Sequence, residues 1–372
     1  MHPLASSIFF HAVGAASAAL CYAPQKRVKR WSWQSYWLIQ AAFCWFLLPV
    51  IGAFLTIPDY WSVVQAIPRE VALRVFLLGM AYGVGGTAFG VAIRYVGFSV
   101  TYAMAIGIST VVGTSYAIVK GATSLADASA NIHAFTAKAG SGWVLAGIGI
   151  AIVGIMFCGV AGRGKERDQA KNRAAEAPAG SAIVGLLLCV VAGVLSGVYG
   201  VALAEGGAIA TLAEANAAGH TVLGIDAATF TSNAIYPFSN AGAFLTTALY
   251  CLFLHRRDKT LSEVVRLPEG KEKASLAVNW AMAILTGCLW YGQFFFYGFG
   301  HYFIMKVAGF GEVCWAIHMI LLIMLGTLAG VFFGEWKGSS RRTSVALALT
   351  IAILVVGVVI LAYGNYAGQN AR

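Results

Sequence analysis

Ten long apolar runs constrain the fold of this chain more than any other feature. They cover residues 4–24, 34–57, 71–95, 99–119, 142–161, 182–205, 227–254, 276–300, 312–335 and 343–364. A helix needs about 20 mostly apolar residues to cross a bilayer, whereas a membrane-spanning strand shows alternating polarity over about ten residues. Because the runs are continuously apolar and of helical length, we expect an all-α polytopic membrane protein with ten transmembrane helices.

The composition agrees with a chain whose surface faces hydrocarbon. Of the 372 residues, 59% are hydrophobic and 11% are charged, whereas soluble domains carry about 25% charged residues. The net charge of +10 does not indicate nucleic-acid binding, since the basic residues lie in short loops between the runs. The seven cysteines form no CxxC pair, so we expect neither disulfides, a metal nor another cofactor. The expected macromolecular environment is the lipid bilayer, and no oligomeric state is predicted.

The basic residues predict an orientation. Most of them lie in loops that follow odd-numbered runs, at 26–30, 163–173, 256–273 and 337–342. Loops rich in lysine and arginine stay in the cytoplasm. We therefore expect a protein of the bacterial inner membrane with both termini in the periplasm, and with the polar segments 121–141 and 206–226 on that side.

Residues 162–181 form the most charged and least apolar stretch of the chain. They divide the ten runs into five (residues 1–161) and five (residues 182–372). Because five is odd, the second half would enter the membrane with inverted topology, a recurring transporter design with the substrate site near the midplane. We expect two inverted five-helix repeats joined by a cytoplasmic linker.

Among the ionisable residues within or at the ends of apolar runs, four are candidates for proton coupling. His11 lies near the middle of the first run and His318 lies in the ninth. Ionisable groups are costly inside a bilayer, and histidine titrates near pH 6.5, so each is either a neutral structural hydrogen-bonder or a functional group such as a proton carrier. Glu205 and Glu312, at the outer ends of their runs, are further candidates for proton coupling, unless they simply lie in the wet interface.

Neutral polar and aromatic residues indicate a sugar site. Trp290, Gln293 and Phe294 share one helical face at three-to-four spacing. Amides can bind sugar hydroxyls, and flat rings can cover the apolar face of the sugar. The candidate substrate-binding residues are Trp290, Tyr291, Gln293, Phe294, Trp315, Asn240 and Asn279. The alternative is that the aromatic residues face lipid or form an interfacial belt, which we expect for Trp31, Trp33 and Trp37.

Enzyme signatures are weak. The chain contains no GxSxG, HExxH or Walker A pattern and no soluble domain for a nucleotide. An ion gradient is therefore the simplest energy source for a solute carrier. A membrane-embedded enzyme stays open as an alternative, with Glu205, Glu312 and His301 as its only candidate cluster.

Several stretches resemble the bacterial L-rhamnose–proton symporter family of the drug/metabolite transporter superfamily. They include Ile8–Ala19, Val28–Trp33, Trp290–Tyr297, Gly300-His301, Trp315 and His318-Met319. The resemblance runs through the chain in the same order. It implies ten spans in two related halves and import of a deoxy-sugar, L-rhamnose, by proton symport with alternating access.

The sequence departs most from this pattern at 121–141 and around 201–226, where Glu205 has no obvious counterpart. A transporter of another sugar, or a metabolite exporter on the same scaffold, therefore stays open as an alternative.

Overall fold

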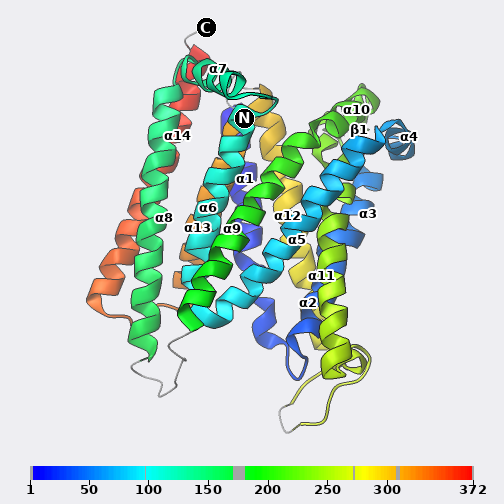
Figure 1. The fold of residues 1–372 in the computed structure, drawn as a ribbon, viewed down its shortest axis with the longest axis vertical. Helices are drawn as coiled ribbons and strands as arrows, with labels where there is room; N and C mark the ends of the chain where they lie inside the picture. Colours follow the sequence, from blue (N-terminus) through cyan, green and yellow to red (C-terminus); the bar gives the residue numbers. More distant parts are fainter. Residues whose placement is uncertain (1–2, 97, 171–180, 271–272, 307–310, 371–372) are drawn as a thin grey trace. The chain divides into compact units, whose positions relative to one another are not determined.

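The structure, a computed structural model, is almost entirely helical and describes residues 3–96, 98–170, 181–270, 273–306 and 311–370 (Figure 1). Within this described part, nine helical segments are long and apolar enough to cross a membrane. Helices suit this environment because they satisfy their own backbone hydrogen bonds where water is absent. The chain is thus an α-helical, multi-pass membrane protein. Half of the expected linker, residues 171–180, lies outside the described residues.

Helix α12 (Leu276–Lys306) corresponds to the eighth predicted span but is not among those nine segments. It has 31 residues, more than a bilayer crossing requires. Its glycines and tyrosines, together with Asn279 and Gln293, lower its mean hydropathy. The prediction of ten spans is therefore matched in part, and the helix that falls short carries most of the candidate sugar site.

The chain forms two compact units. Unit 1 contains residues 1–16, 85–204 and 300–372, and unit 2 contains residues 17–84 and 205–299. The divisions fall inside helices, so α1 (Pro3–Leu20), α5 (Arg69–Val96) and α12 each contribute to both units, and Glu205, the last residue of α9, belongs to unit 2.

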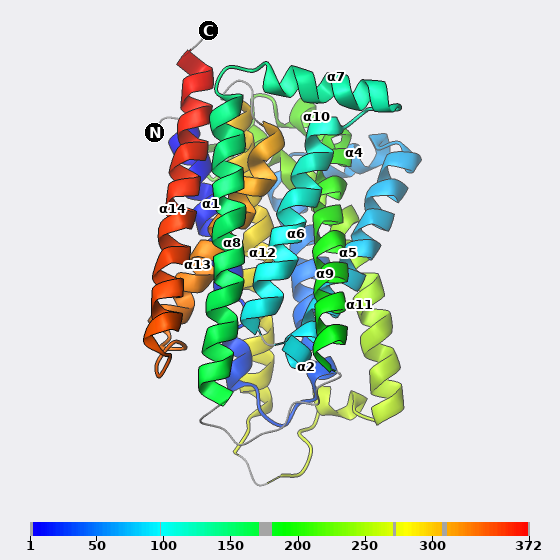
Figure 2. The ribbon, with the colours of Figure 1, turned by 60° about the vertical axis from the view of Figure 1, so that its left-hand side comes forward.

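Unit 1 is built around a close pair of long helices. Its elements, besides its parts of α1, α5 and α12, are α6 (Phe98–Val119), α7 (Leu125–Thr136), α8 (Ser141–Ala170), α9 (Ser181–Glu205), η5 (Gly311–Val313), α13 (Cys314–Phe332) and α14 (Arg341–Asn370). Helices α8 and α14 lie side by side over their length (Figures 1 and 2).

Glycines bring the backbones of α8 and α14 into contact. A Cβ on Gly147 would lie 2.8 Å from the carbonyl oxygen of Gly357 and 2.6 Å from the backbone nitrogen of Leu361. A Cβ on Gly364 would lie 2.7 Å from the backbone nitrogen of Val144. Later residues of α8 face earlier residues of α14, so the two helices run antiparallel. Only glycine allows this separation.

One end of unit 1 is closed by α7, which lies crosswise to α8 (Figure 2). Ser124 and Asp127 form a capping box that starts α7. The first turn of α1 and the last turn of α14 lie at this same end of the unit (Figures 1 and 2).

Unit 2 contains the remaining elements. They are η1 (Pro24–Arg27), α2 (Trp33–Ala41), η2 (Ala42–Leu47), α3 (Leu48–Thr56), α4 (Tyr60–Ala66), α10 (Gly207–Ala217), β1 (Thr221–Val222), β2 (Ile225–Asp226), η3 (Ala227–Ala234), α11 (Tyr236–Asp258) and η4 (Leu261–Val264). Helix α11 packs against α2, η2 and α3. The two strands form a small antiparallel hairpin, whose turn residues Leu223 and Gly224 both have positive φ, as tight hairpins require.

The second predicted span is one helix with a widened turn. Segments α2, η2 and α3 follow each other without a break, and η2 is a π-helix. Pro49 begins α3. Because proline has no N–H, the carbonyl of Trp45 loses its usual partner four residues later, which gives a physical reason for the widened turn. Such π-turns shift the angular position of the side chains that follow and are frequent at functional sites.

Candidate functional site

Trp290 is the centre of a buried aromatic cluster in unit 2. Its ring centroid lies 5.1 Å from that of Trp45, 5.6 Å from that of Tyr22 and 5.7 Å from that of Trp37. The rings meet at steep angles, as aromatic pairs prefer. We call the three indole side chains of Trp37, Trp45 and Trp290, together with the phenol ring of Tyr22, the indole cluster. The expectation that Trp37 belongs to an interfacial belt is wrong, because it is only 2% exposed.

The next turns of α12 extend this cluster. Phe294 is buried, with its ring 6.4 Å from that of Tyr82 and 5.9 Å from that of Tyr236. The hydroxyl of Tyr236 donates a hydrogen bond of 2.6 Å to the carbonyl of Phe294, which ties α11 to α12. Tyr291 is buried, and its hydroxyl packs where a side chain on Gly52 would otherwise lie. These are aromatic residues of a packed interior rather than of a lipid-facing surface.

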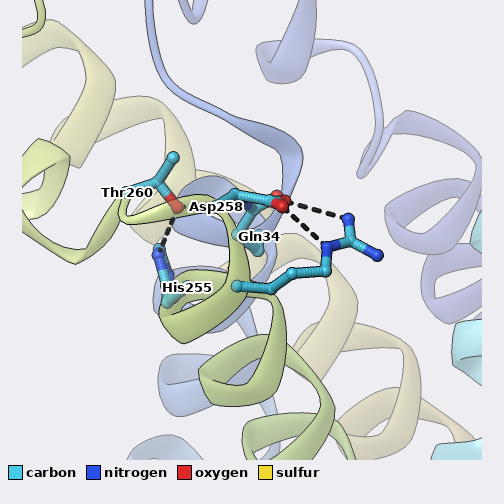
Figure 3. A network of polar contacts seen from close by, with 5 residues as sticks. Gln34, His255, Asp258 and Thr260 are labelled. Atoms are coloured by element: carbon cyan, nitrogen blue, oxygen red, sulfur yellow. Dashed lines mark hydrogen bonds and ion pairs between the residues drawn. The ribbon is translucent and has the colours of Figure 1, made fainter.

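A polar network holds the first turn of α2, the helix that carries Trp37. The amide nitrogen of Gln34 donates to the Thr260 hydroxyl at 2.8 Å and to the Asp258 carboxylate at 3.4 Å. The guanidinium of Arg257 donates to the same carboxylate at 2.7 and 3.0 Å, and Figure 3 shows Gln34, His255, Asp258 and Thr260 of this network. A ring nitrogen of His255 lies 2.9 Å from the same threonine hydroxyl. The network joins the end of α11 to the start of α2.

The three predicted amide residues have different surroundings. Asn279 is occupied by the backbone of Lys29, donating to its carbonyl at 2.8 Å and accepting from its N–H at 3.1 Å. Asn240 is fully buried on α11 and accepts from the Ser239 hydroxyl at 3.4 Å. Gln293 is buried one turn after Trp290. Asn279 therefore holds a loop, whereas Gln293 and Asn240 are buried amides for which sugar binding stays a prediction.

His11 and His318 form a pair in unit 1. Both are fully buried, and their ring centroids lie 5.6 Å apart. Gly300 packs against the His11 ring, since a Cβ there would lie 2.6 Å from it. The Ser7 hydroxyl donates to the Gly300 carbonyl at 2.8 Å, which holds α1 against α12 at this level. Two titratable rings in contact inside a membrane helix bundle suit a proton site.

The two predicted carboxylates are held in ion pairs at helix ends. Glu312 lies 2.6 Å from the ammonium of Lys138 in unit 1, with both side chains about one-third exposed. Glu205 lies 2.8 Å from the guanidinium of Arg74 in unit 2. Neither carboxylate lies within the histidine pair or the indole cluster of its own unit.

Trp315 is a packing residue of unit 1. Its indole N–H donates to the Ser109 carbonyl at 3.0 Å. A Cβ on Gly113 would lie 2.6 Å from that nitrogen, and a Cβ on Gly200 would lie 3.1 Å from the ring. The ring thus fills the space left by two glycines, which anchors α13 to α6 and α9.

These features define the class of this protein: an α-helical, multi-pass membrane protein that encloses buried histidine, amide and aromatic side chains, as solute carriers do. A purely structural bundle would have no need for such costly groups at this depth.

Residues 2–367 match the family model of the L-rhamnose-proton symport protein, and the chain belongs to this family. It is 31% identical over 358 residues to the L-rhamnose-proton symporter of Cronobacter sakazakii, with 96% of each chain covered. It is 31% identical over 364 residues to that of Klebsiella pneumoniae, with 98% of each chain covered. It is 30% identical over 358 residues to that of Escherichia coli, covering 96% of this chain and 97% of the relative. The family is one of transporters rather than enzymes.

Proposed function

We propose that this protein imports a deoxy-sugar, L-rhamnose, together with protons, and that its site opens alternately to the two sides of the bacterial inner membrane. The family and the names of the relatives support the substrate and the coupling ion. The buried indole cluster is the observation that carries the proposal: rings around Trp290 offer flat apolar faces of the kind that sugars bind. Gln293 and Asn240 supply amides for its hydroxyls.

Two inverted repeats, residues 1–161 and 182–372, are part of this proposal. Segments α2, η2 and α3 are counted here as one span. In each half, the second span then belongs to unit 2 and the fourth and fifth spans belong to unit 1. The third span of each half is divided between the two units. Spans of equal rank also pack together: α8 with α14, α6 with α13, and α2 with α11. Elements related by a two-fold axis pair in this way, and inverted repeats are common in secondary transporters.

The proposed orientation has the odd-numbered loops in the cytoplasm and both termini in the periplasm. The basic residues of these loops support it. The shared position of α7, the start of α1 and the end of α14 at one end of unit 1 also supports it (Figure 2).

Protons are carried by the pair His11 and His318 in this proposal. A histidine can gain or lose a proton over the pH range of a bacterial proton gradient, and a pair in contact binds one proton more readily than two because like charges repel. Glu312 and Glu205 are assigned the lesser role of neutralising Lys138 and Arg74 at the helix ends.

The direct test is uptake of labelled L-rhamnose into proteoliposomes. An imposed gradient, acidic on the side corresponding to the periplasm, should drive accumulation, and a proton ionophore should abolish accumulation but leave equilibration. No rhamnose uptake, and no competition by rhamnose against other labelled sugars, would contradict the substrate.

The histidine pair is tested by the double substitution His11→Gln and His318→Gln. We expect it to abolish proton-driven accumulation while sugar exchange between the two sides continues, because exchange needs no net proton movement. His133→Gln, an exposed histidine on α7, is the control and should accumulate like the unmodified protein. Full accumulation by the double variant would refute the assignment.

A further inference from the structure

Gln40 is a buried amide whose side chain makes no hydrogen bond in the described part of the chain. It lies on α2 and is 0% exposed, and neither its nitrogen nor its oxygen has a hydrogen-bond partner among the described residues. A buried amide that makes none of its hydrogen bonds is costly, and native proteins seldom tolerate one without a reason. Gln34, two turns earlier on the same helix, has its amide nitrogen fully engaged.

Two indole N–H groups from nearby residues of the chain also lack a hydrogen-bond partner within the described ranges. Those of Trp37 and Trp45 are buried and have no acceptor among the described residues. Four neutral hydrogen-bonding atoms, three nitrogen donors and one oxygen acceptor, thus come from three residues of one short stretch of helix. Because none is charged, they suit an uncharged ligand rich in hydroxyls better than an ion, which would need a compensating charge.

The local geometry brings these groups toward Trp290. Trp37 lies three residues before Gln40 and therefore shares its face of α2. The widened turn of η2 begins two residues after Gln40 and carries Trp45. The rings of Trp37 and Trp45 both lie within 6 Å of the Trp290 ring, centroid to centroid. The backbones also meet here, since a Cβ on Gly287 would lie 3.0 Å from the Gln40 carbonyl oxygen, one turn of α12 before Trp290.

A sugar would satisfy these groups together. A primary amide both donates and accepts, so it can bind two neighbouring hydroxyls at once. The indole N–H groups would donate to hydroxyl oxygens, and the Trp290 ring would cover the C–H face. Every group involved belongs to unit 2.

We infer that Gln40, with the indole N–H groups of Trp37 and Trp45, binds the hydroxyls of the transported sugar and sets which hydroxyl pattern is accepted. This inference rests on the proposed sugar transport and adds three residues to its site.

The test exploits the opposite effects that a binding amide and a structural amide have on stability. The full-length protein in detergent is titrated with L-rhamnose, followed by tryptophan fluorescence and isothermal calorimetry, and melted without sugar. We expect Gln40→Leu to keep or raise the melting temperature, since it removes unmet hydrogen-bonding groups, and to weaken L-rhamnose binding at least about tenfold. Gln40→Asn, which keeps the amide on a shorter stem, should bind with intermediate affinity.

Gln34→Leu is the matched control for stability. It breaks two hydrogen bonds of the network in Figure 3 and should lower the melting temperature. If Gln40→Leu also lowered the melting temperature and left the L-rhamnose affinity unchanged, the inference would be overturned.

Deoxy analogues of L-rhamnose separate this inference from the proposed function. The unmodified protein should bind one of these analogues, which lacks a ring hydroxyl, less tightly than it binds L-rhamnose. The Gln40→Leu protein should bind the same analogue as tightly as it binds L-rhamnose. If the unmodified protein binds L-rhamnose and every deoxy analogue is weakened equally in both proteins, the inference alone fails. If it binds none of L-rhamnose, L-mannose and L-fucose, the proposed function fails.

Discussion

Asp127 fixes the start of α7 through a compact set of hydrogen bonds. Its carboxylate accepts from the Thr123 hydroxyl at 2.7 Å and from the backbone N–H groups of Thr123 and Ser124 at 3.0 and 3.1 Å. These bonds, foremost that of the Thr123 hydroxyl, hold the pKa of Asp127 below its ordinary value. A carboxyl with a lowered folded-state pKa stabilises the fold above its ordinary pKa, about 3.9, and this contribution is lost as the pH falls through the lowered value.

We therefore expect α7 to open more readily in acid. Hydrogen exchange of peptides covering Leu125–Thr136, corrected for the intrinsic pH dependence, should show protection that is constant above about pH 5 and declines below about pH 4. Asp127→Asn removes the titrating group. In this variant, the protection of the α7 peptides should already be lower at neutral pH and should not decline further as the pH falls. Identical pH profiles in both proteins would contradict this account.

Buried polar residues divide into two groups at this same scale. Asn279 and Trp315 make their hydrogen bonds to backbone groups and hold elements together. Gln40, Trp37 and Trp45 leave groups unmatched in the described part of the chain. Both kinds look alike in the sequence, as a polar residue in an apolar run, because the difference depends on which backbone lies opposite.

At the scale of elements, the α8–α14 contact makes a sharp prediction about two glycines on one helix. A Cβ on Gly147 would press against the backbone of α14, whereas a Cβ on Gly149 would meet nothing within 4 Å. Gly147→Ala should therefore destabilise the protein by about 1–3 kcal/mol, as overpacking does. Gly149→Ala should be neutral or slightly stabilising, because alanine favours the helix.

Thermal melting of both variants in detergent checks this expectation. Since the substitutions are chemically identical and two residues apart, the difference in melting temperature isolates the helix contact. Equal melting temperatures would show that α8 and α14 are not this close in the folded protein.

At the scale of the whole molecule, the orientation predicts where a reporter is active. Alkaline phosphatase folds only after export, so fusions within 121–141 or after the last residue should be active. Fusions within the charged loops at 163–168 or 256–266 should be inactive. Active fusions in those charged loops would reverse the proposed orientation.

Much of the fold followed from the sequence, because apolar runs of helical length have few other solutions in a membrane. The nine segments confirm a multi-pass helical protein, whereas α12 shows the limit of this prediction, since its polar and aromatic residues dilute its hydrophobic signal. The two units could not be foreseen, because their boundaries lie within helices.

From the sequence, most of the candidate sugar site is predicted along α12 and none of it on α2. Trp37 near the start of a span looks like an interfacial residue until α12 is packed against it. Gln40 carried the same signal as Gln293, an amide within an apolar run, and the sequence could have drawn attention to it. The π-turn that carries Trp45 could not be foreseen from composition, although the missing N–H of Pro49 offers a physical reason for it.

The contact between Gly147 and Gly357 also has a genetic consequence. Every codon for glycine begins with two guanines, and any change at either position encodes a larger residue or a stop. No single-nucleotide mutation can therefore alter these positions without adding atoms where two backbones already touch. In a random mutant library screened for altered sugar preference, we expect almost no functional variants with substitutions at these two glycines. The exposed Val153 and Met156 of the same helix should accept many.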